Sequence, residues 1–222
     1  MTFAEFLSKG GPVMYVILAL SILALAIVVL KSAQFAALRL KQTRFVDEAL
    51  KHIIDGDAAA AGRLLDRNHP VARVMRATLA SARDARLDEQ AVRAEVERVG
   101  SAELRRLESW LRGLSAIGHL CPLLGLFGTV LGMIAAFMTI EHAASAVNPA
   151  QLAGGIWEAL LTTAFGLMVA IPAMAAFYLF EGEVDRIRAL MKDGTVRVLV
   201  RCGKRADGSL LTSAAVGEDY GV

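Results

Sequence analysis

This sequence lacks the residues on which disulfide-rich domains and most enzymes depend. Its 222 residues include only two cysteines, and aromatic side chains make up 6% of the chain. Cys121 lies in an apolar run and Cys202 near the C-terminus, in different compartments of the topology argued below, so a disulfide is not expected. We find no glycine-rich phosphate loop, no Ser/His/Asp arrangement and no His/Cys cluster with metal-ligand spacing. We therefore expect a protein that is not an enzyme and holds no metal or cofactor.

Charged residues are almost absent from three long stretches of the chain. Residues 12–30 and 113–140 contain no Asp, Glu, Lys or Arg, and residues 153–180 contain only Glu158. A helix needs about 20 apolar residues to cross the hydrocarbon core of a bilayer. The composition, which is 55% hydrophobic, is also more apolar than that of a typical soluble domain. These features predict an all-α membrane protein with three transmembrane helices.

Basic residues are missing from residues 141–152 and nearly missing from the N-terminal segment, where Lys9 stands alone. All other lysines and arginines follow the first or the third apolar run. Because basic loops stay on the cytoplasmic side, we expect the N-terminus outside and the C-terminus inside, with long cytoplasmic helical extensions. The predicted order is a periplasmic segment (1–11), a transmembrane helix (12–30), a cytoplasmic helical segment (31–112), a second transmembrane helix (113–140), a periplasmic loop (141–152), a third transmembrane helix (153–180) and a cytoplasmic tail (181–222).

The first apolar run has one feature of a cleaved signal peptide, a small-x-small match at residues 24–26. However, the run continues through Leu30, and the basic residues follow it rather than precede it. This order favours a retained helix over a signal peptide. Pro12 suits the first turn of such a helix, and we expect the helix to extend past Arg39.

Apolar residues in segment 31–112 recur at helical spacing. Asp57 and Asp88 stand where an N-cap is needed before two of these helices. No sequence break separates the last helix from the next apolar run, so we expect one helix from about Asp88 to Ile140, with Pro122 as the point of a kink. The arginines are interleaved with acids and not with aromatics, which indicates a solvated helical face and no nucleic-acid partner.

Small residues line one face of the second and of the third apolar run. The predicted faces consist of Gly125, Gly128, Gly132 and Ala135 on the second helix, and of Ala159, Thr163, Gly166, Ala170 and Ala173 on the third. Gly128 and Gly132 form a small-x-x-x-small pair, which lets helix backbones approach closely. Joined by a short turn, the two faces predict an intimate helical hairpin. Pro172 should bend the third helix toward its cytoplasmic end.

Glu158 is the one acid inside an apolar run. A charge at mid-membrane costs about 2.5–3.5 kcal/mol, so such acids face a bundle interior or water and mark ion pathways. With three nearby hydroxyls, Thr129, Thr162 and Thr163, it forms a candidate proton pathway. Thr162 shares the face of Glu158, whereas Thr163 lies about 140° away around the helix, which calls for a wide lumen or a gap between helices. The alternative is that Glu158, about one turn from the outer loop, only extends to the membrane interface.

Three segments carry a resemblance to a known family. They are GGPVMY at residues 10–15, GLFGTVLGM at 125–133, and GIWEALLTTAFGL at 155–167 with AIPA at 170–173. At these residues the sequence resembles the MotA/TolQ/ExbB proton-channel family, and it looks most like the ExbB type. The resemblance covers all three apolar runs in order. The two hairpin motifs are highly specific together, and the first segment is supportive only.

The resemblance implies a motor subunit in the bacterial inner membrane that is driven by the proton motive force. It implies a pentamer whose lumen holds two copies of a single-span ExbD/TolR-type protein, with membrane lipids around it and a TonB-like transducer as the recipient of the force. By motif position, the key acid of the family falls on Glu158. Its pore threonines fall on Thr129 and Thr163, and its proline falls on Pro172.

The sequence departs from the family pattern in three respects. The N-terminal segment is short, which leaves ExbB and TolQ open, and Trp157 precedes the acid where many members have a small residue. No second lone acid lies on the first two helices, so a partner carboxylate must come from another chain. Two other readings are a non-conducting membrane scaffold and a MotA-type flagellar stator. The stator ranks lower because such proteins have four spans and this chain has three.

Overall fold

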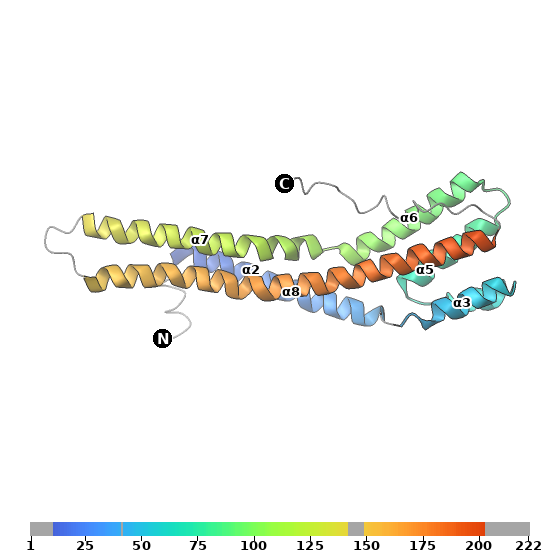
Figure 1. Cartoon of the computed structure of the whole chain (residues 1–222), viewed down its shortest axis with the longest axis horizontal. Helices are drawn as coiled ribbons and strands as arrows, with labels where there is room; N and C mark the ends of the chain where they lie inside the picture. The colour runs from blue at the N-terminus through green and yellow to red at the C-terminus, as the bar shows by residue number, and fades with distance from the viewer. Residues whose placement is uncertain (1–10, 41, 142–148, 203–222) are drawn as a thin grey trace. The chain divides into compact units, whose positions relative to one another are not determined.

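The computed structural model of the chain describes residues 11–40, 42–141 and 149–202, and every element in these ranges is a helix (Figure 1). The helices divide into two units. The first is drawn from Met1–Lys31 and Trp110–Phe180, and the second from Ser32–Ser109 and Glu181–Val222. Two helices, α2 (Gly11–Ala37) and α8 (Pro149–Arg201), contribute to both units.

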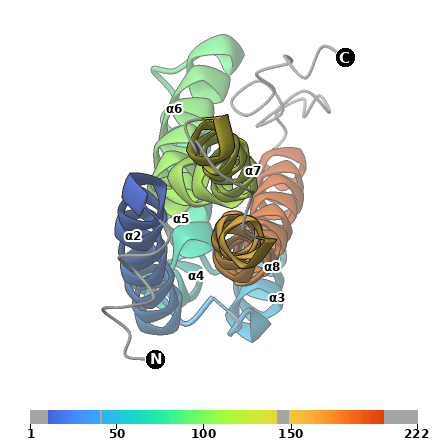
Figure 2. The ribbon, with the colours of Figure 1, turned by 90° about the vertical axis from the view of Figure 1, so that its left-hand side faces the viewer.

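The first unit consists of α7 (Leu111–Glu141) with the apolar parts of α2 and α8 (Figure 2). All three helices contribute to one apolar core, whose buried residues are Val13, Ile17, Ala24, Ile27, Leu114, Ile117, Cys121, Val169, Ala170 and Ala173. Many large apolar side chains lie outside this core, among them Leu25, Leu30, Leu123, Phe127, Met168 and Leu179. An exposed apolar surface of this extent suits a lipid environment or contact with other membrane helices.

The second unit is built from four shorter helices and the last part of α8. The shorter helices are α3 (Arg44–Ile54), α4 (Ala58–Leu64), α5 (Pro70–Arg83) and α6 (Glu89–Glu108). Helix α3 packs on α4, and α5 packs on α6. The C-terminal part of α8 buries Ile187, Met191 and Leu199, and a Cβ atom on Gly194 would lie 3.0 Å from the Met75 sulfur.

The predicted N-caps in this unit are confirmed. The Asp57 carboxylate accepts a hydrogen bond from the Ala60 N–H at 2.9 Å, and the Asp88 carboxylate accepts one from the Ala91 N–H at 2.7 Å. Each satisfies an amide of the first turn that has no partner inside its own helix. Both helix starts therefore follow from local sequence.

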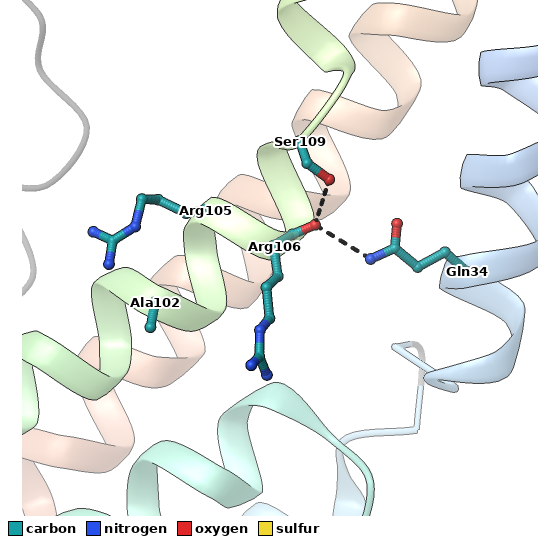
Figure 3. A pocket seen from close by; sticks show the side chains of 5 residues that line it. All are labelled: Gln34, Ala102, Arg105, Arg106 and Ser109. Atoms are coloured by element: carbon teal, nitrogen blue, oxygen red, sulfur yellow. Dashed lines mark hydrogen bonds between the residues drawn. The ribbon is translucent and has the colours of Figure 1, made fainter.

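The expected continuous helix from Asp88 to Ile140 is wrong. Helix α6 ends at Glu108, and Trp110 adopts a left-handed backbone with φ of 67° before α7 begins. The carbonyl of Arg106, which a continuous helix would bond to the N–H four residues later, instead accepts the Ser109 hydroxyl at 2.9 Å and the Gln34 amide at 3.2 Å (Figure 3). A hydroxyl and an amide thus replace the missing backbone donor. Pro122, by contrast, lies inside α7, which continues on both sides of it.

Two other helix ends differ from the sequence-based expectation. Helix α2 stops at Ala37, and Arg39 has a left-handed backbone with φ of 48°, so the predicted extension past Arg39 is wrong. Helix α8 is longer than the predicted third span, because it begins at Pro149 and continues to Arg201. The predicted N-terminal segment, most of the 141–152 loop and the end of the tail lie outside the described residues.

Candidate functional site

Helices α7 and α8 approach each other through residues with little or no side chain. A Cβ atom on Gly166 would lie 2.5 Å from the Cys121 carbonyl oxygen. One on Gly128 would lie 2.5 Å from the Thr162 hydroxyl oxygen. Such distances are far below van der Waals contact, so only glycine fits at these two positions. The hairpin therefore depends on backbone-to-backbone contact.

The same contact continues toward the loop end of the hairpin. A Cβ atom on Gly132 would lie 2.9 Å from the Ala159 side chain, and one on Gly155 would lie 2.8 Å from the Ala136 side chain. Ala136 is buried, whereas Ala135, which the sequence placed on this face, is exposed. The reason is the helical repeat: four residues after Gly132 is Ala136, and the contact keeps to that step.

Thr162 joins the two helices directly. Its side chain is only 2% exposed, and its hydroxyl donates to the Ala159 carbonyl at 2.7 Å and to the Gly125 carbonyl at 3.1 Å. The second bond crosses from α8 to α7. Gly125 allows it because a Cβ atom there would lie 2.9 Å from the Thr162 carbonyl oxygen. The structure thus places Thr162 inside the helix contact.

Thr163 and Thr129 differ from Thr162 in the bonds that their hydroxyls make. The Thr163 hydroxyl oxygen is buried and has no hydrogen-bond partner within the described residues. The Thr129 hydroxyl, which is accessible, donates to the Leu126 carbonyl at 2.6 Å, three residues back in its own helix. A buried hydroxyl without a partner is costly, so Thr163 is the hydroxyl of this group that most needs a partner from outside the chain.

Glu158 lies one helical turn before Thr162 on α8 and is partly exposed. Its neighbour Ala159 is buried against α7, while Trp157 on its other side is 61% exposed. The carboxylate makes no hydrogen bond and no ion pair among the described residues. Glu158 therefore lies at the edge of the hairpin contact, where a group from another chain can reach it.

Pro172 lies inside α8, and the helix continues on both sides of it. Proline has no N–H, so the carbonyl four residues earlier, at Met168, loses its backbone donor. The side chains of Met168 and Pro172 are both exposed. The interruption thus lies on the surface of the hairpin, about two and a half turns beyond Thr163.

Sequence reasoning missed two contacts of the same kind. A Cβ atom on Gly118 would collide with the Met174 side chain, and the carbonyl of Cys121 is the group that excludes a side chain at Gly166. The spacing of three or four residues from Gly118 through Cys121 to Gly125 carried this signal. It shows that the small-residue face of α7 begins two turns earlier than predicted.

The arrangement offers one carboxylate, hydroxyl groups and a closely packed apolar hairpin. Among the residues that the structure describes, no group of three His, Cys, Asp or Glu side chains could hold a metal ion. Three stretches in the same residues are long and apolar enough to cross a membrane: Gly11–Ala37, Glu89–Glu141, which includes the break between α6 and α7, and Leu152–Arg201. The fold and the site define a multi-pass α-helical membrane protein with an acid in its third span.

Comparison with known proteins identifies the family. The model of the MotA/TolQ/ExbB proton channel family matches residues 66–193, and the chain belongs to that family. A putative biopolymer transport protein, ExbB-like 1, from Synechocystis is 35% identical over 175 residues, which cover 78% of this chain and 68% of the relative. The biopolymer transport protein ExbB of Pseudomonas putida is 37% identical over 112 residues, covering 50% of this chain and 34% of that protein. Within the family the chain most resembles ExbB.

Proposed function

We propose that this chain is the proton-conducting subunit of an ExbB/TolQ-type motor in the bacterial inner membrane. Family membership supports a channel subunit of the ExbB, TolQ or MotA type. The observation that carries the proposal is Glu158, the one acid in the third apolar run, which has no partner among the described residues. An unpaired acid at this depth is expensive unless it faces water or a partner group.

The proposed pathway runs along α8, with Glu158 as the group that binds and releases the proton. The hydroxyl of Thr163 is enclosed and unbonded among the described residues. It can therefore accept or donate a hydrogen bond to a water molecule or a partner side chain without giving up another bond. Thr129 on α7 supplies a second accessible hydroxyl. Thr162, with its hydroxyl bonded to two carbonyls, serves the pathway by holding the two helices together.

Family membership and the exposed apolar surface of the first unit support the proposed partners. We propose a homopentamer around two copies of a single-span ExbD/TolR-type protein, whose carboxylate would complete the proton relay. The exposed apolar side chains of α2, α7 and α8 provide surface for copies of the chain and for lipid. With the N-terminus outside and the C-terminus inside, each proton that moves inward gains about 2.3 kcal/mol per 100 mV. That energy would drive a TonB- or Tol-type transducer.

The test is work that depends on the proton gradient. In a bacterium that lacks its own subunit of this type, the wild-type chain and its partner should restore energised transport or envelope integrity. Glu158→Gln should assemble to the same level and restore neither. Glu48→Gln, which removes an exposed acid of α3, serves as the matched control and should behave as the wild type. Full activity of Glu158→Gln would refute the proposal.

The same variants distinguish a motor from a scaffold. In a scaffold, Glu158 would only bind a basic group of a partner, and activity would not respond to uncouplers. A scaffold should tolerate Glu158→Gln better than Glu158→Lys, because the neutral side chain keeps a hydrogen bond and the lysine repels the partner. A motor should lose its activity with both.

A further inference from the structure

A cavity of about 440 Å³ lies in the second unit, at the end of α2 and beside the turn that precedes α5. Two of its lining residues are apolar: Ala37, the last residue of α2, and Leu38, which follows it. The others are polar, cationic or aromatic: Arg39, Gln42, Phe45, Arg67, Asn68 and His69. The lining contains two arginines and no carboxylate, so the cavity is electropositive.

The two arginines of the cavity have no counter-ion in the part of the chain that the structure describes. The guanidinium of Arg67 lies 5.4 Å from the centre of the Phe45 ring, which provides a cation–π contact and no negative charge. Several other arginines of the same unit are paired with acids: Arg73 contacts the Glu103 carboxylate at 2.5 Å, and Arg76 contacts Asp66 at 2.8 Å. The cavity is therefore a place where positive charge is left uncompensated.

His69 adds a buried donor to this cavity. Its side chain is 4% exposed, and its Nδ1 accepts a hydrogen bond from the Val71 N–H at 3.2 Å. A neutral histidine that accepts at Nδ1 carries its proton at Nε2. The Nε2 atom is buried and makes no hydrogen bond of good geometry among the described residues, and the Leu40 backbone is an acceptor that raises the pKa of the ring. An acceptor in the cavity would therefore compete with the Leu40 backbone for this donor.

Asn68 provides a further hydrogen-bond donor at this cavity. Its carbonyl oxygen accepts a hydrogen bond from Arg73 at 3.0 Å, so its amide N–H groups remain for another acceptor. Arg39, which lines the cavity, occupies a left-handed backbone position with φ of 48° at the end of α2. Glycine or asparagine is usual there, and a longer side chain costs about 1–2 kcal/mol. Strained backbone positions of this kind cluster at functional sites.

We propose that this cavity binds a phosphate group. Planar guanidinium groups match the oxygens of phosphate in a bidentate manner, and Arg39 and Arg67 supply two of them. The Nε2–H of His69 and the amide of Asn68 are two further donors. No carboxylate lines the cavity to repel a phosphate. Phosphate chemistry of this kind comes either from the headgroup of an anionic phospholipid or from a free phosphate ion.

The course of α2 favours the headgroup as the source. The apolar run ends at Leu30, and Ala37 at the cavity lies seven residues further along the same helix, about 10 Å. Headgroups occupy roughly 5–8 Å beyond each side of the hydrocarbon core. Basic residues that directly follow a transmembrane helix attract anionic lipids, so a tilted α2 would bring the cavity to headgroup depth.

The test compares two double variants of equal charge change. Arg39→Gln with Arg67→Gln removes the cavity arginines, whereas Arg44→Gln with Arg63→Gln removes two exposed arginines of α3 and α4 that do not line it. One arm titrates the full-length chain in neutral detergent with inorganic phosphate by calorimetry. The other measures the phosphatidylglycerol retained by the chain after extraction from nanodiscs that contain equal amounts of phosphatidylcholine and phosphatidylglycerol.

We expect the cavity double variant to weaken phosphate binding or lipid retention at least about tenfold relative to the control pair, since each charged hydrogen bond that is lost weakens binding by about that factor. Loss in the calorimetric arm alone identifies a free ion as the ligand, and loss of retained phosphatidylglycerol identifies the lipid. Equal behaviour of the two double variants in both arms would overturn the proposal. Gln42→Glu, which adds a negative charge to the lining without removing a contact, should reproduce the loss if the arginine variant folds poorly.

Discussion

The two units of this chain hold their helices together in opposite ways. In the first, α7 and α8 meet at glycines, and Thr162 donates a hydrogen bond across the contact to the Gly125 carbonyl. In the second, helices are joined by large buried side chains such as Met191 and by ion pairs between elements. The comparison shows that the surrounding medium, lipid or water, determines which contacts hold helices together. Lipid rewards close backbone packing, whereas water rewards burial of large apolar side chains and tolerates charges at the rim.

The largest expected effect comes from filling the glycine contact of the first unit. Gly166→Ala should destabilise the hairpin by about 2–3 kcal/mol, because its methyl group would overlap the Cys121 carbonyl. Gly154→Ala is the control, since a Cβ atom there meets nothing within 4 Å. Unfolding in detergent can be followed by tryptophan fluorescence, because both tryptophans of the chain, Trp110 and Trp157, belong to the first unit. Equal stability of the two variants would show that the helices are not in contact at Gly166.

The next effect concerns the charge pairs of the second unit. Glu103 is 5% exposed, and its carboxylate contacts Arg73 at 2.5 Å and Arg106 at 3.3 Å. Glu103→Gln should lower the free energy of unfolding by about 2 kcal/mol, since it leaves the partly buried Arg73 without its counter-ion. Amide hydrogen exchange in α5 and α6 would locate the loss. Unchanged exchange in both helices would contradict a stabilising role for this pair.

A smaller effect should depend on pH. Burial lowers the pKa of His69, the Leu40 backbone raises it, and the charges of Arg73, Arg186 and Arg67 lower it further. The native state therefore prefers neutral His69, and the associated stability is complete above the pKa of about 6.5 of the unfolded chain. It should be lost as the pH falls from that value through the lowered pKa of the folded state.

The control for this effect is His69→Asn, because asparagine keeps an N-cap acceptor for α5 and does not titrate. Thermal unfolding of the full-length chain between pH 7.5 and 5 should show a steeper decline for the wild type than for His69→Asn. Parallel pH profiles for the two proteins would assign the decline to other groups.

The smallest effect is expected at an exposed pair. Glu95 and Arg98 on α6 are 2.7 Å apart, and the hydrogen bond from Arg98 lowers the pKa of the Glu95 carboxyl. Because the pair is open to water, Glu95→Gln should change the free energy of unfolding by at most about 0.5 kcal/mol. A loss as large as that of Glu103→Gln, in the same denaturation experiment, would break the distinction between buried and exposed pairs.

The sequence predicted most of the first unit because its signals are local. Lack of charge marked the three apolar runs, and the spacing of glycines indicated which helix faces meet. The end of that contact was misplaced by one residue, at Ala135 instead of Ala136, because a face derived from spacing has no fixed edge. The sequence also could not predict that the Thr162 hydroxyl is hydrogen-bonded whereas the Thr163 hydroxyl is not. This difference depends on which carbonyls of α7 lie next to each hydroxyl.

The second unit was harder to predict. Its N-caps followed from single aspartates, but the break between α6 and α7 did not, because neither proline nor glycine marks it. The Arg106 carbonyl is satisfied there by Gln34, a residue 72 positions away in the chain. The cavity around His69 is likewise assembled from the end of α2 and the turn before α5. Such long-range contacts leave no periodic signal in the sequence.

The central claim is that Glu158 carries protons, and proton flux tests it most directly. The complex with its single-span partner would be reconstituted in vesicles that contain a pH-sensitive dye, and a potassium diffusion potential would be imposed. We predict inward proton flux for the wild type and for Glu48→Gln, and flux at the level of empty vesicles for Glu158→Gln. Flux that is the same in Glu158→Gln and in the wild type would contradict the account.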